Sequence, residues 1–330
     1  MQLNRIIALV LVAVCFVAAI FGIQRQSEEA FNLRQALDRS SDRLELVSLD
    51  GVITGVRASS SGAMAVRNRL LDLKKIDSVK GVLLSINSPG GTVGASKEVY
   101  EAVKQLQQIK PVVVSMLDQG TSGGYYIASA ATKIYANAGT LTGSIGVILN
   151  GFNVRELLNR VGIEPQTIKT GPYKDIFSSF RQLGEPERQL LQDLLQNTYQ
   201  EFITDVSKGR NMDLETVRKL ADGRIYTGRQ AKENKLVDEI GTLDDAIADL
   251  RKLARAKFNL PDIKELPIER SPNSVERLLD QLLNKADLSL NLASPLSKNL
   301  DSLVQRFFQP NSAGLSSNDP PVLLMPSWFN

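Results

Sequence analysis

The sequence predicts an α/β protein built on a mostly parallel, buried β-sheet. Two observations support this prediction. Apolar segments of strand length alternate with helical segments between residues 44 and 136, and the segment over 79–86 is apolar almost throughout. Such strands are buried on both faces by helices, as in βαβ units. A chain of 330 residues that is 43% hydrophobic can bury a core of this kind.

The expected elements follow in order along the chain. Residues 44–49 alternate between apolar and polar before the turn signal Asp50-Gly51, which predicts a strand. Helical spacing follows over 63–76, and a more buried strand covers 79–86. The next elements are a helix over 96–107, a strand over 111–117, a helix over 122–131, a short strand over 133–136 and a strand-like segment over 141–150.

Beyond residue 184 the sequence predicts mostly helix. Residues 185–209 place leucines and aromatic residues near helical spacing, typical of a long amphipathic helix in the core or at a subunit contact. Short helices are expected over 214–220 and 228–234. A helix over 243–256 then closes the main domain.

An apolar N-terminal segment predicts a membrane anchor. Residues 6–23 carry no charge and would rise about 27 Å as a helix, close to the hydrocarbon thickness of a bilayer. A cleaved secretory signal is the main alternative, but Ala18, Ala19 and Ile20 offer a poor cleavage site. A buried soluble helix would need a polar face, which this segment lacks. Arginines are more numerous after the segment than before it, a weak signal for a cytoplasmic domain.

These features divide the chain into four parts. We expect an anchor over 1–25, a polar stalk over 26–43, a main domain over 44–260, and a helical appendage with a flexible tail over 261–330. The tail ends in a strongly apolar run over 321–329. Such a run suggests docking on the protein itself or on a partner.

Composition excludes several classes of function. The 39 basic and 36 acidic residues form no dominant block, so no nucleic-acid partner is expected. Cys15 is the single cysteine and there is no histidine. We therefore expect no disulfide, no structural metal site built from cysteine or histidine ligands, and no cofactor. Lipid acylation of Cys15 is disfavoured because the preceding residues lack a lipobox pattern.

Ser122 lies in the glycine-rich turn Gly120-Thr121-Ser122-Gly123-Gly124, after one predicted strand and before a helix. A serine hydroxyl attacks carbonyls only when a base takes its proton, and imidazole, the usual base, is absent from this chain. A catalytic Ser122 would therefore need a lysine or a carboxylate. The alternative is that Ser122 caps the helix, a common role for serine.

A second glycine turn follows the buried strand that ends near residue 86. Gly90 and Gly91 would bring backbone amides to the carboxyl end of the sheet without side-chain obstruction. Such amides could form one half of an oxyanion hole, and the amide of Gly123 could form the other half. An ordinary tight turn between strand and helix is the alternative.

The base has several candidates among the lysines. Lys174 is marked only by its turn context, Gly171-Pro172-Tyr173-Lys174-Asp175, and a solvated surface lysine is the default interpretation. A lysine that acts as a base near neutral pH must be largely unprotonated. Such a state requires burial, because burial disfavours the charged amine.

Five motifs in order resemble those of short-form signal peptide peptidases A, which are membrane-anchored bacterial Ser-Lys proteases. The resemblance covers about residues 44–253. The motifs are Asn87-Ser88-Pro89-Gly90-Gly91, Thr121-Ser122-Gly123-Gly124-Tyr125-Tyr126, Leu141-Thr142-Gly143-Ser144-Ile145-Gly146, Tyr173-Lys174-Asp175, and Gly223-Arg224-Ile225-Tyr226-Thr227-Gly228-Arg229-Gln230-Ala231. The family resemblance implies a fold of the Clp-protease and crotonase type, a superhelix of repeated ββα units.

The resemblance also implies roles for individual residues. It makes Ser122 the nucleophile, Lys174 the general base and Ser144 a hydroxyl partner that orients the lysine, with Gly90, Gly91 and Gly123 around the oxyanion. In family members the serine and lysine are thought to meet across a subunit interface, which implies a ring-shaped homo-oligomer. The implied substrates are hydrophobic peptides such as signal-peptide remnants. The implied location is the bacterial cytoplasmic membrane, with the catalytic domain outside.

Two other functions remain open. A catalytically silent membrane scaffold of the same fold would use Ser122 only as a helix cap. A crotonase-like acyl-CoA enzyme would also use backbone amides as an oxyanion hole, although a membrane anchor is unexpected for that class.

Overall fold

The fold is built from eight strands and eight helices within the described residues. A computed structural model describes residues 42–55, 62–263 and 265–270. The strands are β1 (Arg43–Asp50), β2 (Val79–Ser88), β3 (Val112–Thr121), β4 (Lys133–Ala136), β5 (Leu141–Gly143), β6 (Ile225–Thr227), β7 (Glu239–Ile240) and β8 (Ile268–Arg270). The helices are α2 (Ala63–Leu73), α3 (Val93–Gln107), α4 (Gly123–Ser129), α5 (Arg155–Arg160), α6 (Glu185–Arg210), α7 (Leu214–Leu220), α8 (Gly228–Glu233) and α9 (Leu243–Phe258).

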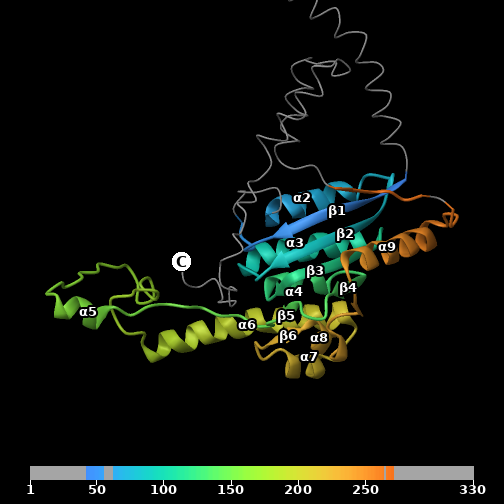
Figure 1. Ribbon diagram of the computed structural model, residues 1–330. Helices are drawn as coiled ribbons and strands as arrows, with labels where there is room; N and C mark the ends of the chain where they lie inside the picture. The colour runs from blue at the N-terminus through green and yellow to red at the C-terminus, as the bar shows by residue number, and fades with distance from the viewer. Residues whose placement is uncertain (1–41, 56–61, 264, 271–330) are drawn as a thin grey trace, which may run out of the picture. The chain divides into compact units, whose positions relative to one another are not determined.

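All eight strands belong to one sheet. Its main order is β6-β5-β3-β2-β1-β8, while β4 pairs with β3 and β7 pairs with β4. Every pair is parallel except β5 with β6. Figure 1 shows β1, β2 and β3 side by side with helices packed along them. The predicted α/β class is confirmed.

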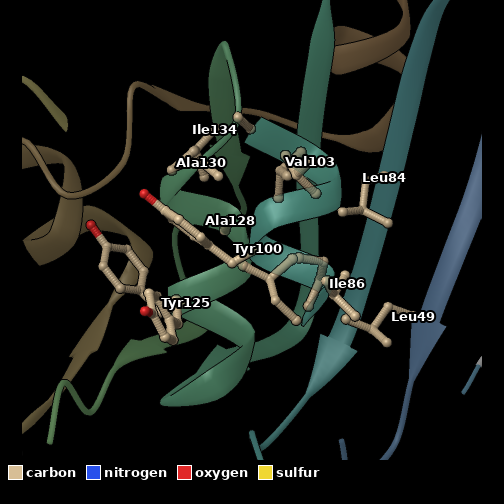
Figure 2. Close-up of a cluster of buried hydrophobic side chains, with 14 of the residues drawn as sticks. Leu49, Leu84, Ile86, Tyr100, Val103, Tyr125, Ala128, Ala130 and Ile134 are labelled. Atoms are coloured by element: carbon tan, nitrogen blue, oxygen red, sulfur yellow. The ribbon is translucent and has the colours of Figure 1, made fainter. Parts of the chain in front are cut away.

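The two faces of the sheet form two separate cores. Because successive residues of a strand point to opposite faces, Leu84 and Ile86 of β2 pack with α2, α3 and α4, whereas Leu83 packs with α9. Figure 2 shows part of the first core, with Tyr100 of α3 and Tyr125 of α4 among its buried side chains. This double burial explains why the β2 sequence is apolar almost throughout.

Strands β2 and β3 end at the same edge of the sheet. Their pairing continues in register to Ile86 and Met116, and then shifts so that Ser88 lies opposite Gly120. The shift places extra residues of β3 opposite Asn87, as in a β-bulge. The turns that follow these two strands therefore leave the sheet next to each other.

Most helix and strand positions agree with the sequence-based expectations, but the segment over 141–150 does not. Only Leu141–Gly143 is a strand, because Gly143 and Ser144 both have positive φ angles, 77° and 51°, and turn the chain away from the sheet. The structure also contains α5, β6, β7 and β8, which the sequence did not predict. Each of these has six residues or fewer, too short for a clear periodic pattern.

The predicted anchor, most of the stalk, and the appendage beyond residue 270 lie outside the described residues. In the described ranges, no helix combines the length and the apolar character needed to cross a membrane. Strand β8 falls after the boundary expected at residue 260, yet it pairs with β1 through Leu44 and Ile268. The sheet therefore continues into the segment expected to be an appendage.

Candidate active site

Two glycine-rich turns meet at the carboxyl ends of β2 and β3. A Cβ atom added to Gly90 would lie 2.8 Å from the Gly123 nitrogen and 2.8 Å from Ser122 Cβ, so the two turns are in direct contact. Gly90 also has a φ of +100°, which L-residues rarely adopt. This position therefore requires glycine for two independent reasons, and it brings Gly90 against Ser122 as expected.

Ser122 has a strained backbone. Its φ and ψ are 51° and −117°, outside the regions favoured by non-glycine residues. Strain of this kind costs about 1–3 kcal/mol and persists only where neighbouring contacts enforce it. Here Ser122 N–H donates to Gly143 O at 2.8 Å and Ser122 O accepts from Tyr126 N–H at 2.9 Å. A serine held on a strained turn between strand and helix is typical of nucleophile turns in hydrolases.

The helix-cap interpretation of Ser122 is wrong. The residue occupies the N-cap position of α4, but its side chain makes no capping hydrogen bond. Capping serines have extended backbones that aim the hydroxyl at the first-turn amides, and the positive φ of Ser122 prevents that geometry. The hydroxyl is therefore left for another role.

The structure distinguishes the three glycine amides. Gly90 N–H donates to Ser88 Oγ at 3.1 Å, a buried contact. For Gly91 and Gly123 no acceptor is present among the described residues. These two amides lie close together, because a Cβ on Gly123 would come within 3.4 Å of the Gly91 nitrogen. An oxyanion held here would therefore take its hydrogen bonds from Gly91 and Gly123, while Gly90 shapes the turn.

Gly91 is fixed by the chain segment after β1. It forms an isolated parallel bridge with Ile53, in which Ile53 N–H donates to Gly90 O and Thr92 N–H donates to Ile53 O, both at 2.8 Å. A Cβ on Gly91 would lie only 1.9 Å from Ile53 O. The Gly91 amide is therefore held by backbone contacts on both sides.

Ser144 lies next to the nucleophile turn. It directly follows Gly143, whose carbonyl accepts from Ser122 N–H, and its own amide donates to Arg224 O at 2.8 Å. Its φ of 51° is positive, like that of Ser122. The structure thus brings Ser144 and Ser122 to neighbouring positions with positive φ, directly after the ends of β5 and β3.

A buried polar cluster lies behind α4 and was not predicted from the sequence. Tyr126 Oη donates to Asp205 Oδ2 at 2.6 Å, and Lys97 Nζ donates to the same oxygen at 2.5 Å. The Tyr126 ring is flanked by Tyr100 and Phe202, with ring centroids 4.9 and 4.5 Å away. The cluster therefore joins α3, α4 and α6 at Tyr126, four residues after Ser122.

Lys97 follows Ser96, whose Oγ would lie 2.3 Å from a Cβ on Gly123, but its charge makes it unsuited to act as the base. Burial lowers its pKa, yet hydrogen bonds to Asp205, Glu201 and Glu101 outweigh burial and raise the pKa above its usual value. The amine therefore stays charged. Burial, and then the hydrogen bond to Asp205, also raises the pKa of Tyr126, which keeps its phenol a donor.

Removing the Tyr126 hydroxyl tests this cluster. Tyr126→Phe should lower the free energy of unfolding by about 1.5–3 kcal/mol, because a buried carboxylate loses a charge-assisted donor. Tyr199→Phe is the matched control on α6, since Tyr199 Oη donates to the neutral Ala221 carbonyl at 2.9 Å. Urea unfolding should show the larger loss for Tyr126→Phe, and equal losses would contradict the charge-assisted assignment.

Lys174 lies on a different part of the molecule. Residues 147–183, which we call the arm, connect β5 to α6 and include no buried residue. Figure 1 shows that the arm, with α5 in it, extends away from the sheet, and that the chain then returns as α6. Lys174 is exposed in this structure. The structure therefore does not bring Lys174 to Ser122 within one chain.

Helix α6 sets the separation between the two residues. Its C-terminal half is docked on α4 through Asp205 and through Gly209, where a Cβ would lie 2.0 Å from Ser129 O. Its first turn carries Glu187, which is linked by Arg181 to Asp175, the residue after Lys174. The 18 positions from Glu187 to Asp205 span about 27 Å of helix. A lysine side chain cannot bridge such a distance.

Comparisons with known proteins give a consistent result. Residues 104–257 match the model of Peptidase family S49, and residues 39–141 match the model of Clp protease. A putative protease of Synechocystis sp. is 43% identical over 241 residues, covering 70% of this chain and 86% of that protein. A putative signal peptide peptidase SppA of Enterococcus faecium is 40% identical and covers 64% of each chain. The chloroplastic serine protease SPPA of Arabidopsis thaliana is 34% identical over 69% of this chain and 34% of that protein.

The chain spans most of the Synechocystis protein but less than two thirds of the other two. Among solved structures, a mutant of the 1510-N membrane-bound stomatin-specific protease aligns with a TM-score of 0.46 and 14% identity. That alignment covers 71% of this chain and 99% of that one. At this level of similarity, the alignment supports no conclusion about the site.

Proposed function

This chain belongs to peptidase family S49, as its five motifs predicted, and we propose that it is a serine endopeptidase in which Lys174 activates Ser122. The protease class follows from the family. The nucleophile is proposed from the geometry of the Ser122 turn and from the resemblance of its motifs, and the base is proposed from that resemblance alone. The two other functions considered from the sequence, a silent scaffold and an acyl-CoA enzyme, gain no support from the structure.

One observation carries the proposal. Ser122 is held in a strained turn with its hydroxyl free of capping, beside the unoccupied amides of Gly91 and Gly123. A serine that served only structure would gain nothing from this strain. A nucleophile needs both an exposed hydroxyl and nearby donors for the oxyanion.

The proposed reaction is acyl transfer in two steps. Neutral Lys174 accepts the Ser122 proton as Oγ attacks the peptide carbonyl, and the amides of Gly91 and Gly123 bind the developing oxyanion. The protonated lysine then gives its proton to the departing amine, which leaves an ester on Ser122. Water, deprotonated by the same lysine, hydrolyses that ester and regenerates the serine. Ser144 is proposed to orient the lysine amine.

We place the lysine on a neighbouring chain. The α6 spacing separates Lys174 from Ser122 of the same chain, so a second subunit must supply the amine. The arm offers a surface for this contact, because it exposes many large apolar side chains. They include Ile148, Phe152, Leu157, Val161, Ile163, Ile168 and Phe177. Surfaces of this kind are usually buried in an assembly, and a repeated head-to-tail contact closes into a ring.

The proposed substrates are hydrophobic peptides, such as remnants of cleaved signal peptides. The proposed location is the bacterial cytoplasmic membrane, where residues 1–25 would act as a single-pass anchor that contacts lipid and the catalytic domain would face outward. These features come from the family resemblance and from the apolar segment over 6–23. No cofactor, metal or nucleic acid has a role in this mechanism.

Mixing two inactive variants tests the two-chain site. Ser122→Ala subunits keep the lysine and Lys174→Ala subunits keep the serine. Equal amounts, denatured and reassembled together, should regenerate about a quarter of the sites if each site takes its residues from two chains. Hydrolysis of a fluorogenic apolar peptide measures the recovery.

The controls for this experiment are each variant reassembled alone and a mixture of unmodified chains carried through the same cycle. The first should be inactive and the second fully active. A mixed sample that stays inactive, while the unmodified chains recover, would place the dyad within one chain and contradict the proposal.

A further inference from the structure

The turn that carries Lys174 is fastened to α6 by one arginine. Arg181 donates to Asp175 Oδ2 from Nε at 2.9 Å and to Asp175 Oδ1 from Nη2 at 2.8 Å. It also donates to Glu187 Oε2 at 2.7 Å and to Glu187 Oε1 at 2.5 Å. Glu187 lies in the first turn of α6 and also accepts from Gly184 N–H at 2.8 Å. Arg181 therefore joins the residue after Lys174 to the beginning of the long helix.

This cluster is more buried than its surroundings. The side chains of Asp175 and Glu187 are only 13% and 10% exposed, although the arm includes no buried residue. Paired hydrogen bonds between guanidinium and carboxylate fix both distance and orientation. In the absence of an apolar core, these bonds determine where the Lys174 turn lies relative to α6.

Both oxygens of Asp175, the residue after Lys174, accept hydrogen bonds within this cluster. Asp175 Oδ1 accepts from Lys169 Nζ at 2.6 Å and from Arg181, and Oδ2 accepts from Arg181. Hydrogen bonds from Arg181 first, and then from Lys169, hold the pKa of Asp175 well below its usual value. Asp175 is therefore ionised at neutral pH, and both of its oxygens are held by these two partners.

We propose that Arg181 is a positioning residue for the reaction, which holds the Lys174 turn on α6 and keeps the Asp175 carboxylate away from the Lys174 amine. The inference rests on the proposed role of Lys174 as the base. The inference explains why Asp175 is paired with Arg181. A base must lose its proton, and an unpaired carboxylate beside the amine would stabilise the protonated form.

The charges around the turn predict the direction of the effect. The charged groups joined by hydrogen bonds around Asp175 are Lys169, Asp175, Arg181 and Glu187, two cations and two anions. Removing the Arg181 charge leaves an excess of one negative charge beside Lys174. This excess favours the protonated amine, so a higher pH is needed to produce the neutral base.

The test is the pH dependence of kcat/KM for Arg181→Gln in the full-length chain. The acid limb should move to higher pH by about one unit, with roughly tenfold lower activity near neutral pH and recovery of most of it at higher pH. Arg181→Lys keeps the positive charge and should keep the acid limb in place. Arg188→Gln is the matched control, since Arg188 is 60% exposed on α6 and pairs with Glu185 at 3.7 Å.

A second variant separates charge from folding. In Arg181→Gln combined with Asp175→Asn, the carboxylate that captures the lysine is absent, so the acid limb should return towards its original position. An unmoved acid limb in Arg181→Gln, or a loss of equal size at every pH, would overturn the inference. Wild type and Ser122→Ala are run beside the variants. If wild type shows no serine-dependent hydrolysis, the proposed function itself fails; if it does, only the role of Arg181 is in question.

Discussion

Ser122→Ala and Lys174→Ala are each expected to lower kcat/KM by roughly 10³-fold or more, without loss of folded protein. The serine variant removes the attacking oxygen, and the lysine variant removes the group that accepts its proton. Both residues work in the same step, so the double variant should be hardly less active than either single one. Peptide hydrolysis by purified assemblies provides the measurement.

Two observations would separate catalytic from structural loss in these variants. Ser122→Ala removes a hydroxyl that makes no capping hydrogen bond, and Lys174 is exposed in one chain, so unfolding midpoints should stay near those of wild type. A fluorophosphonate probe should label wild type at Ser122 and label neither variant appreciably. Normal turnover by either variant would contradict the assignment of Ser122 and Lys174 as nucleophile and base. Wild type that fails to react with the probe would favour a silent scaffold.

Gly91→Ala is expected to have the second largest effect, on both stability and rate. Its Cβ would lie 1.9 Å from Ile53 O, a backbone atom that cannot rotate away. Overpacking of this kind costs about 1–3 kcal/mol or more. The backbone shift that relieves it would also move the Gly91 amide, and loss of one oxyanion donor lowers kcat by roughly 10²–10³-fold.

Gly94→Ala provides the control for this prediction. Gly94 lies three residues further on, in the first turn of α3, and a Cβ there would meet no atom within 4 Å. Alanine is favoured over glycine in a helix by up to about 1 kcal/mol, so this variant should be at least as stable as wild type. If Gly91→Ala behaves like Gly94→Ala in urea unfolding and in turnover, the packing of Gly91 on Ile53 and its role as a donor are both refuted.

The sequence predicted the parts of the fold that depend on local pattern. Strands β1, β2 and β3 and the helices between them were expected because their apolar periodicity is strong. The sequence also identified the turns at Gly91 and Ser122 as the place where the site would form, since parallel strands end at one edge. It could not decide whether Ser122 caps α4, because that depends on a backbone angle rather than on residue type.

Contacts between distant segments were beyond prediction. Nothing in the spacing of Tyr126 and Asp205 indicates that they meet, and each also has an ordinary interpretation as a core aromatic or a surface acid. Asp175, Arg181 and Glu187 are spaced six residues apart, and the first two lie in turns outside any helix or strand, where no periodic pattern applies. Their pairing arises from the path of the arm, and only the structure reveals it.

The length of α6 would make proteolytic activity depend on the concentration of subunits. Under the proposed two-chain site, a newly made subunit carries a nucleophile and a base at opposite ends of a helical span of about 27 Å, so they cannot combine. Proteolysis then begins only when subunits accumulate enough to associate, and dilution reverses it. The helix thus acts as a built-in delay, which spares neighbouring proteins from a solitary protease without a separate inhibitor or propeptide.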